Sequence, residues 1–191
     1  MKSQQNDPIY SQISQVKDAV AEVLEHAKKL GATAAEAAMS STSGLSVSTR
    51  MGEVETIEFN QDGGLGISVY VGNNKGSAST ADLNPKTLRT VVEKAIDIAK
   101  FTSDDPFNGV ADKELLEFNP QDLDLYHPWD VSPEQGIELC HTAEQAALNA
   151  DERIVNSDGA SFSSHQGLRV YGNSHGLIAG FPRTRHSIST M

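Results

Sequence analysis

Histidines are the first residues to weigh for chemistry, because imidazole is both the commonest metal ligand and a general base. No pair of them has the His-Glu-x-x-His or His-Glu-x-x-x-His spacing that presents two ligands from one helix. His165 and His175 share one segment but are separated by turn residues. Zinc requires a closed set of ligands, so surface histidine is the favoured interpretation. We expect no metal ligand and no cofactor in this chain.

The serines and the cysteine also lack a catalytic context. A Gly-x-Ser-x-Gly nucleophile elbow is absent. Ser164 and His165 are adjacent, and neighbours on one strand point to opposite faces, so they cannot form a hydrogen-bonded dyad with each other. Cys140 is the only cysteine and falls on the apolar stripe of a predicted helix, which is typical of a buried, inert thiol. We therefore predict no catalytic residue.

Two further clusters are better explained by structure than by ligand binding. The run from Gly63 to Gly66 lacks the Gly-x-Gly-x-x-Gly spacing and precedes a predicted strand, so it indicates a hairpin rather than a phosphate site. Asp122, Asp124 and Asp130 have no following Gly of the kind found in calcium loops. A solvated connector is the favoured interpretation of these aspartates.

Four large polar residues remain as candidates for contact with a partner or a peptide. Each lies near a turn or on the open face of a predicted Ser/Gly-rich sheet, where packing gives it no evident role. An ordinary solvated surface is the alternative for each of them. The four candidates are Arg50, Tyr171, His175 and Arg185.

Three amphipathic helices are predicted to position these residues. The first has apolar residues at helical spacing from Ile13 to a cap at Gly31, after a polar stretch over residues 1–10 that we expect to fray. The second begins at Asn84-Pro85, and the third has the capping-box sequence Ser132-Pro133-Glu134-Gln135. The apolar stripe of the second helix comprises Leu88, Val91, Val92, Ala95, Ile98 and Ala99.

Alternating residues predict strands after the first and third helices. The clearest patterns cover residues 45–49 and 65–71. We expect turns at Met51-Gly52, at Asp62-Gly63-Gly64 and at Gly72-Asn73-Asn74, which make an antiparallel meander. Strands return after Asp151, beginning at residues 154–155 and ending beyond Ile188.

The predicted fold class is α+β, with two helix-plus-antiparallel-meander units. We expect an N-terminal α+β domain over residues 1–101, a connector over residues 102–131, and the start of a second, truncated α+β unit over residues 132–191. Residues 40–47 and 163–170 agree at five of eight positions. Because the order of helix and then meander also repeats, an internal duplication is our hypothesis. The residues expected to pin the connector are Phe107, Leu115, Phe118, Tyr126 and Trp129.

The net charge of −11 argues against nucleic-acid binding, since an acidic surface repels phosphate. The sequence contains no apolar run of the roughly 20 residues that a membrane-spanning helix needs, and no apolar signal segment near its start. We therefore expect a cytoplasmic protein without membrane contact.

Four segments together resemble a known family. They are residues 48–83, 101–116, 122–133 and 156–176, and they follow one another as in the N-terminal stretch of PmbA/TldE-type members of the TldD/PmbA metallopeptidase family. The resemblance implies paired subunits, TldD and TldE, that act as a cytoplasmic peptidase on peptides or unfolded proteins. It places the zinc motif in the TldD-like partner and none in this chain. Family members continue for more than this length again, so we expect a C-terminal domain beyond this sequence, which ends inside a predicted strand.

The resemblance favours one function and leaves two alternatives. The favoured function is the N-terminal part of the subunit without metal ligands, which shapes peptide access and partner contacts for peptide maturation and proteolysis. The first alternative is a purely structural dimerisation module with no substrate contact. The second is a stand-alone metal-dependent or hydrolytic enzyme that uses His165, His175 and His186.

Overall fold

The computed structural model describes residues 7–191, which form an α+β fold with two compact units. Unit 1 comprises the described residues up to Ser41, Gly63–Leu123 and Leu168–Pro182. Unit 2 comprises Thr42–Asp62, Asp124–Gly167 and Arg183–Met191. The units interleave along the sequence because long strands contribute residues to both. The boundaries predicted at residues 101 and 131 follow chain order instead, and they stay a prediction.

Helix α1 (Pro8–Lys29) begins earlier than the sequence indicated. Asp7 is its N-cap and accepts a hydrogen bond from the Ile9 backbone N–H at 3.0 Å, and Pro8 occupies the first helical position. The expectation of fraying is therefore wrong for residues 8–10, whereas residues 1–6 lie outside the described residues. The helix ends before Gly31, which has a φ of 95°.

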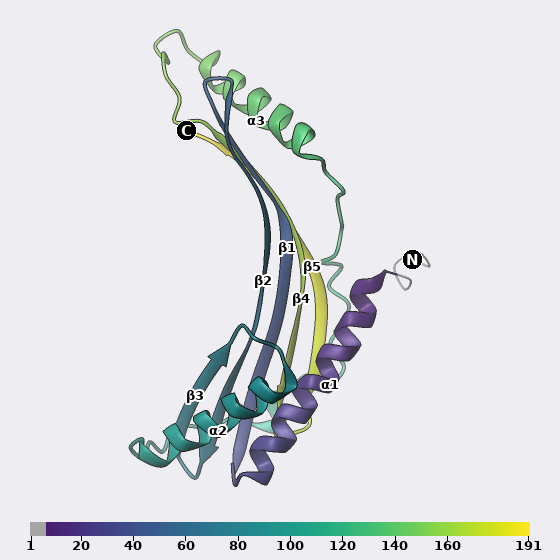
Figure 1. Cartoon of the computed structure of the whole chain (residues 1–191), viewed down its shortest axis with the longest axis vertical. Coiled ribbons are helices and arrows are strands. Elements are labelled where there is room, and N and C mark those ends of the chain that lie inside the picture. Colours follow the sequence, from purple (N-terminus) through teal and green to yellow (C-terminus); the bar gives the residue numbers. More distant parts are fainter. Residues whose placement is uncertain (1–6) are drawn as a thin grey trace. The chain divides into compact units, whose positions relative to one another are not determined.

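Helix α2 (Pro85–Phe101) begins where predicted, with the Asn84 side chain accepting from the Lys86 backbone N–H at 3.0 Å. The predicted buried stripe needs one correction: Ile98 is 44% exposed, and Ile96 is buried. Ile98 lies at the edge of the apolar face, where packing does not cover it. Helices α1 and α2 pack against each other and lie on the same face of the sheet in unit 1 (Figure 1).

The strands form one sheet with the order β3-β2-β1-β4-β5. They are β1 (Ala34–Arg50), β2 (Glu53–Val71), β3 (Asn74–Thr80), β4 (Ala160–Asn173) and β5 (Ile178–Thr190). Strands β2 and β3 pair antiparallel, from Leu65 opposite Thr80 to Val71 opposite Asn74. Strands β1 and β4 are neighbours, with β2 on the other side of β1 and β5 on the other side of β4. This arrangement agrees with the hypothesis of an internal duplication. Superposition of the two halves stays a prediction.

Two predicted features of the strands are wrong. Strand β2 runs through Asp62-Gly63-Gly64 without a turn. A Cβ on Gly63 would lie 2.9 Å from the Ser40 carbonyl oxygen, and one on Gly64 would lie 2.8 Å from that of Thr80. These glycines therefore permit close approach of neighbouring strands rather than a turn. The predicted strand at residues 154–155 is also absent, since β4 begins only at Ala160.

Helix α3 (Pro133–Leu148) covers the core of unit 2 and has the predicted capping box between Ser132 and Gln135. That core contains Leu45, Val47, Cys140, Ala160 and Phe162. Cys140 is fully buried, and burial raises the pKa of its thiol, as expected for an inert cysteine.

The segment between α2 and α3 is irregular apart from the short 3-10 helix η2 (Lys113–Leu115). Tyr126 is buried as predicted, and Trp129 packs edge-on against Phe162. Phe107 and Leu115 do not pin the segment, because their exposed fractions are 95% and 79%. Polar contacts hold its first part instead: the side-chain amide of Asn108 donates to the Asn73 carbonyl at 3.1 Å, and that of Asn74 donates to the Thr102 carbonyl at 2.6 Å. Phe118 is also exposed, at 42%.

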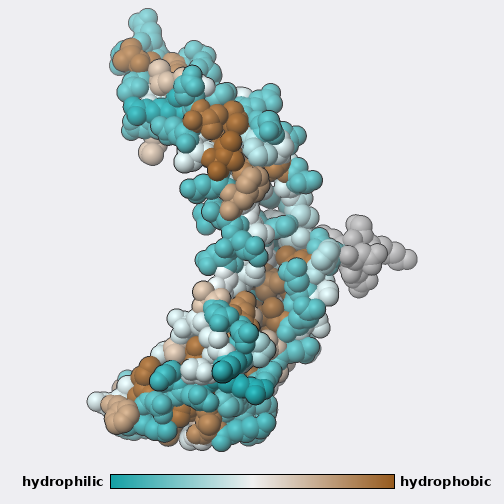
Figure 2. Space-filling view, in the orientation of Figure 1, coloured by the Kyte–Doolittle hydropathy of each residue, from teal (hydrophilic) through white to brown (hydrophobic). Residues whose placement is uncertain are grey.

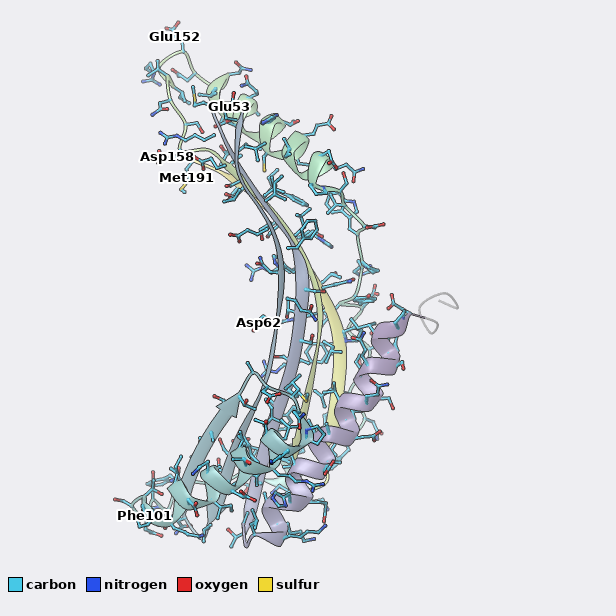
Figure 3. The ribbon with its side chains drawn as sticks, viewed as in Figure 1. Glu53, Asp62, Phe101, Glu152, Asp158 and Met191 are labelled. Carbon is cyan, nitrogen blue, oxygen red and sulfur yellow. The ribbon has the colours of Figure 1, made fainter. Side chains whose placement is uncertain are left out.

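Hydrophilic residues dominate the face shown in Figure 2, and hydrophobic residues appear there in patches. Some large apolar side chains remain exposed, including Phe101 at the end of α2 (Figure 3). No helix within residues 7–191 is long and apolar enough to cross a membrane.

Candidate functional site

The sheet of unit 1 has one face covered by helices and one open face. Along β2, Leu65, Ile67 and Val69 are buried toward the helices, so the alternating residues between them point to the other side. One of these is Ser68, which lies opposite Ser77 of β3 with their hydroxyl oxygens 3.0 Å apart. The open face therefore presents small hydroxyl groups to the solvent.

Glu36 of β1 is the centre of a polar cluster on this face. One carboxylate oxygen accepts a hydrogen bond from the Tyr70 hydroxyl at 3.2 Å, and the other accepts from the Tyr171 hydroxyl at 3.0 Å. The side-chain amide of Asn173 donates to the Tyr171 hydroxyl at 3.4 Å. Because both of its oxygens are engaged, the Glu36 carboxylate is not placed to act as a free general base.

The two tyrosines of this cluster act as hydrogen-bond donors. Tyr70 is only 3% exposed, and burial together with the nearby Glu36 carboxylate raises its pKa to about 12. Burial also raises the pKa of Tyr171. Both hydroxyls thus stay protonated at neutral pH. The cluster fixes the orientation of the residues around it rather than supplying a reactive group.

Beside the cluster lies a hollow of about 520 Å³. The residues of its lining that matter here are Glu36, Gly66, Ser68, Ser77, Arg169 and Tyr171. Arg169 is exposed, and no ion pair engages it within residues 7–191. A guanidinium beside hydroxyl groups can donate hydrogen bonds to carbonyl and carboxylate oxygens. This arrangement suits the binding of polar groups that carry such oxygens.

The structure does not bring the four predicted contact residues together in one site. Tyr171 lies in the hollow, whereas His175 lies in the exposed turn after β4, where its N–H donates to the Asn173 side chain at 3.1 Å. Both belong to unit 1. Arg50 and Arg185 belong to unit 2. The Nε of Arg50 donates to the Ser157 carbonyl at 3.2 Å, and Arg185 is exposed on β5. A role for these residues in partner contact stays a prediction.

Sequence reasoning missed Glu36 and Arg169. Residues 34–39 are rich in Ala and contain Glu, which are strong helix formers, so the start of β1 carried no strand signal. Tyr70 was recognisable on the open face from the alternation along residues 65–71. Glu36, however, contacts Tyr70 across 34 positions of the sequence and Tyr171 across 135. Only strand pairing brings them together.

The histidines do not form a metal centre in the described part of the chain. Within residues 7–191 no group of three or more His, Cys, Asp or Glu side chains could hold a metal ion. Ser164 contacts His186 rather than its neighbour His165: its hydroxyl lies 3.0 Å from Nδ1 of His186, whose Nε2 lies 3.1 Å from the His127 carbonyl oxygen. Because a carbonyl only accepts, Nε2 donates to it, and in a neutral ring Nδ1 then accepts from the Ser164 hydroxyl.

This serine-histidine pair does not by itself define a hydrolase. Nucleophilic attack also requires donors that stabilise the developing oxyanion. Ser164 is only 8% exposed, so access of a substrate to its hydroxyl is restricted. The pair is best described as a polar bridge between neighbouring strands.

Two family models match this chain. Residues 35–99 match the model described as PmbA/TldA metallopeptidase domain 1, and residues 126–191 match the one described as the PmbA/TldA metallopeptidase central domain. Among curated proteins, the Metalloprotease PmbA of Escherichia coli O157:H7 is 60% identical over 156 residues, which are 82% of this chain and 35% of that protein. This chain therefore spans about a third of the length of that relative.

Solved structures show the same fold. A crystal structure from Bacteroides thetaiotaomicron, described as a candidate modulator of DNA gyrase, has a TM-score of 0.80 at 26% identity and covers 91% of this chain and 40% of its own. The structure of TldE from Thermococcus kodakarensis has a TM-score of 0.67 at 17% identity, covering 89% of this chain and 38% of its own. At that identity the second likeness concerns the fold alone.

Proposed function

Because the chain belongs to the PmbA/TldD metallopeptidase family, we propose that it is part of the subunit without metal ligands in a two-subunit, TldD/TldE-type protease. In this proposal the chain shapes peptide access and partner contacts, and it acts in the cytoplasm in peptide maturation and proteolysis. A TldD-like partner supplies the zinc ion and the catalytic residues. The substrate is a peptide or an unfolded protein.

The observation that supports this function best is the open face of unit 1. Its hollow of about 520 Å³ is lined by hydroxyl groups and by Arg169, whose charge is not neutralised by an ion pair within residues 7–191. Serine hydroxyls both donate and accept, so they match the alternating N–H and C=O groups of an extended chain whatever its side chains. Such a surface favours binding of many different peptides.

A site-specific crosslink tests this proposal in the assembled, full-length heterodimer. The photoreactive residue benzoylphenylalanine replaces Ser77, which is exposed on the open face, and Lys94 on the solvent side of α2 is the matched control position. We expect irradiation to attach an unfolded polypeptide substrate to position 77 and not to position 94. The alternative, a structural dimerisation module, predicts normal heterodimer formation without peptide crosslinks at either position, and that result would refute the proposal.

A further inference from the structure

A second hollow, of about 580 Å³, lies within unit 2. It is lined by residues from the segment before α3 and from strands of the sheet, among them Phe59, Asn60, Trp129, Asp130 and Thr184. Its size falls in the range of sites that enclose a small ligand or a few side chains. None of its lining residues lines the hollow on the open face of unit 1.

Trp129 is held in a fixed orientation at this hollow. Its ring meets those of Phe162 and His186 edge-on, with centroid distances of 5.6 Å in both cases and interplanar angles of 82° and 69°. His186 is itself fixed by Ser164 on one ring nitrogen and by the His127 carbonyl on the other. Even so, Trp129 is 47% exposed. An aromatic ring that is already ordered loses little conformational entropy when it binds a ligand.

Phe59 adds a second aromatic surface to the same hollow. Its side chain is 74% exposed although it lies within strand β2. Large apolar side chains that gather at a concave surface mark interaction sites more often than single exposed residues do. Phe59 and Trp129 together therefore offer an incomplete aromatic cluster that a further ring would complete, with the edge-on or offset geometry that aromatic pairs prefer.

The polar residues of the hollow restrict the charge of what it binds. Asp130 is the one acidic residue of the lining, and the lining contains no Lys or Arg. On a chain with a net charge of −11, this environment disfavours an anion. Asn60 and Gln61 supply amide groups, which can pair with the backbone of a peptide.

We propose that this hollow binds an aromatic side chain of an extended, non-acidic peptide segment. The inference rests on the proposed function, in which the chain contacts unfolded polypeptides, and it names the side-chain class that would be selected. Trp129 and Phe59 contact the incoming ring, whereas His186 is a positioning residue that acts through Trp129.

The single tryptophan of the sequence makes a direct test possible, because its fluorescence reports on this hollow alone. The probes are the capped pentapeptides Gly-Ser-Phe-Ser-Gly and Gly-Ser-Ala-Ser-Gly, together with a version of the first that has Glu at both ends. We expect a saturable change in emission with the Phe peptide. Binding of the Ala peptide should be weaker by about tenfold, the factor that corresponds to losing part of the burial of one aromatic side chain. Binding of the Glu-flanked peptide should also be weaker, because its carboxylates are repelled by Asp130 and by the acidic chain.

A matched pair of variants tests whether the Phe peptide binds at this hollow. Phe59→Ala should weaken binding of the Phe peptide by about tenfold. Phe107→Ala, which removes a 95% exposed phenylalanine of unit 1, should leave it unchanged. Neither side chain is part of the core, so both variants should fold. Absence of a saturable signal, equal affinity for the Phe and Ala peptides, or equal losses in the two variants would overturn the inference.

The crosslink at position 77 separates this inference from the function on which it rests. If the hollow fails these tests while the crosslink forms, aromatic selection is refuted and peptide contact at the open face stands. If the Phe peptide binds as expected while position 77 gives no crosslink, the hollow is supported and the open face of unit 1 is refuted as a peptide contact.

Discussion

At the scale of single residues, Glu144 shows how a buried acid can serve structure rather than chemistry. Its carboxylate accepts hydrogen bonds from the backbone N–H groups of Met51 at 2.9 Å and Gly52 at 3.2 Å. These two residues have φ values of 51° and 81° and form the turn between β1 and β2. Glu144 itself is fully buried. The carboxylate therefore satisfies turn donors that burial would otherwise leave without a partner.

The hydrogen bond from the Met51 backbone is the largest of several contributions that hold the pKa of Glu144 below its usual value of 4.5. Because folding lowers this pKa, the ionised carboxylate stabilises the fold. This stabilisation is fully present above pH 4.5 and is lost as the pH falls through the folded-state pKa. We predict that Glu144→Gln lowers the free energy of unfolding at neutral pH by about 1–3 kcal/mol. The difference from the unmodified protein should shrink below pH 4.5.

Denaturant unfolding at a series of pH values measures this difference. Glu138→Gln on the exposed side of α3 is the control, and it should leave the unfolding free energy nearly unchanged at every pH. A loss in the Glu144 variant that stays constant from neutral to acidic pH would contradict a role for the ionised carboxylate.

At the scale of elements, glycines determine how closely α2 and the strands approach. A Cβ on Gly76 of β3 would clash with the Ala95 carbonyl oxygen and lie 2.5 Å from the Ala99 backbone nitrogen, both within α2. A Cβ on Gly66 of β2 would meet nothing within 4 Å. The two glycines look alike in the sequence, but only Gly76 permits a helix to pack directly on the backbone of a strand.

This contrast gives a paired stability test. We predict that Gly76→Ala lowers the free energy of unfolding by about 3 kcal/mol, because α2 must move away from β3. Gly66→Ala should change it by less than about 0.5 kcal/mol. Thermal and chemical unfolding of the two variants side by side measures both values. Equal stability of the two variants would show that α2 does not depend on the small residue at position 76.

At the scale of the whole molecule, the net negative charge of the chain opposes nucleic-acid binding. Its formal net charge is −11, although one structural relative is described as a candidate modulator of DNA gyrase. Binding to duplex DNA depends on releasing counterions through contacts of Lys and Arg with phosphates. A surface with excess acid opposes these contacts.

We therefore predict no binding of the chain to duplex DNA at physiological salt. An electrophoretic mobility shift measured at micromolar protein, with a basic DNA-binding protein as the positive control, checks this expectation. A retarded complex that weakens as salt is raised would reveal a local phosphate-binding surface and contradict the prediction.

The starts of α2 and α3 and the α+β class could be predicted from the sequence, because their signals are local. Asn84 and Ser132 hydrogen-bond to backbone groups within three residues of themselves, so the chain near each cap suffices to identify it. Apolar alternation over residues 65–71 likewise indicated the buried face of β2. These features confirm the predicted fold class.

Only the tertiary structure determines which residues form the candidate site. Glu36 contacts Tyr70 and Tyr171 across 34 and 135 positions, and Ser164 contacts His186 across 22. Such partners depend on the order and register of strand pairing, in which a shift of one residue moves every side chain to the opposite face. The same pairing determined that Gly63 and Gly64 lie inside a strand and not at a turn. Local sequence indicated the helices and the clearest strands, whereas long-range backbone hydrogen bonds define which side chains meet.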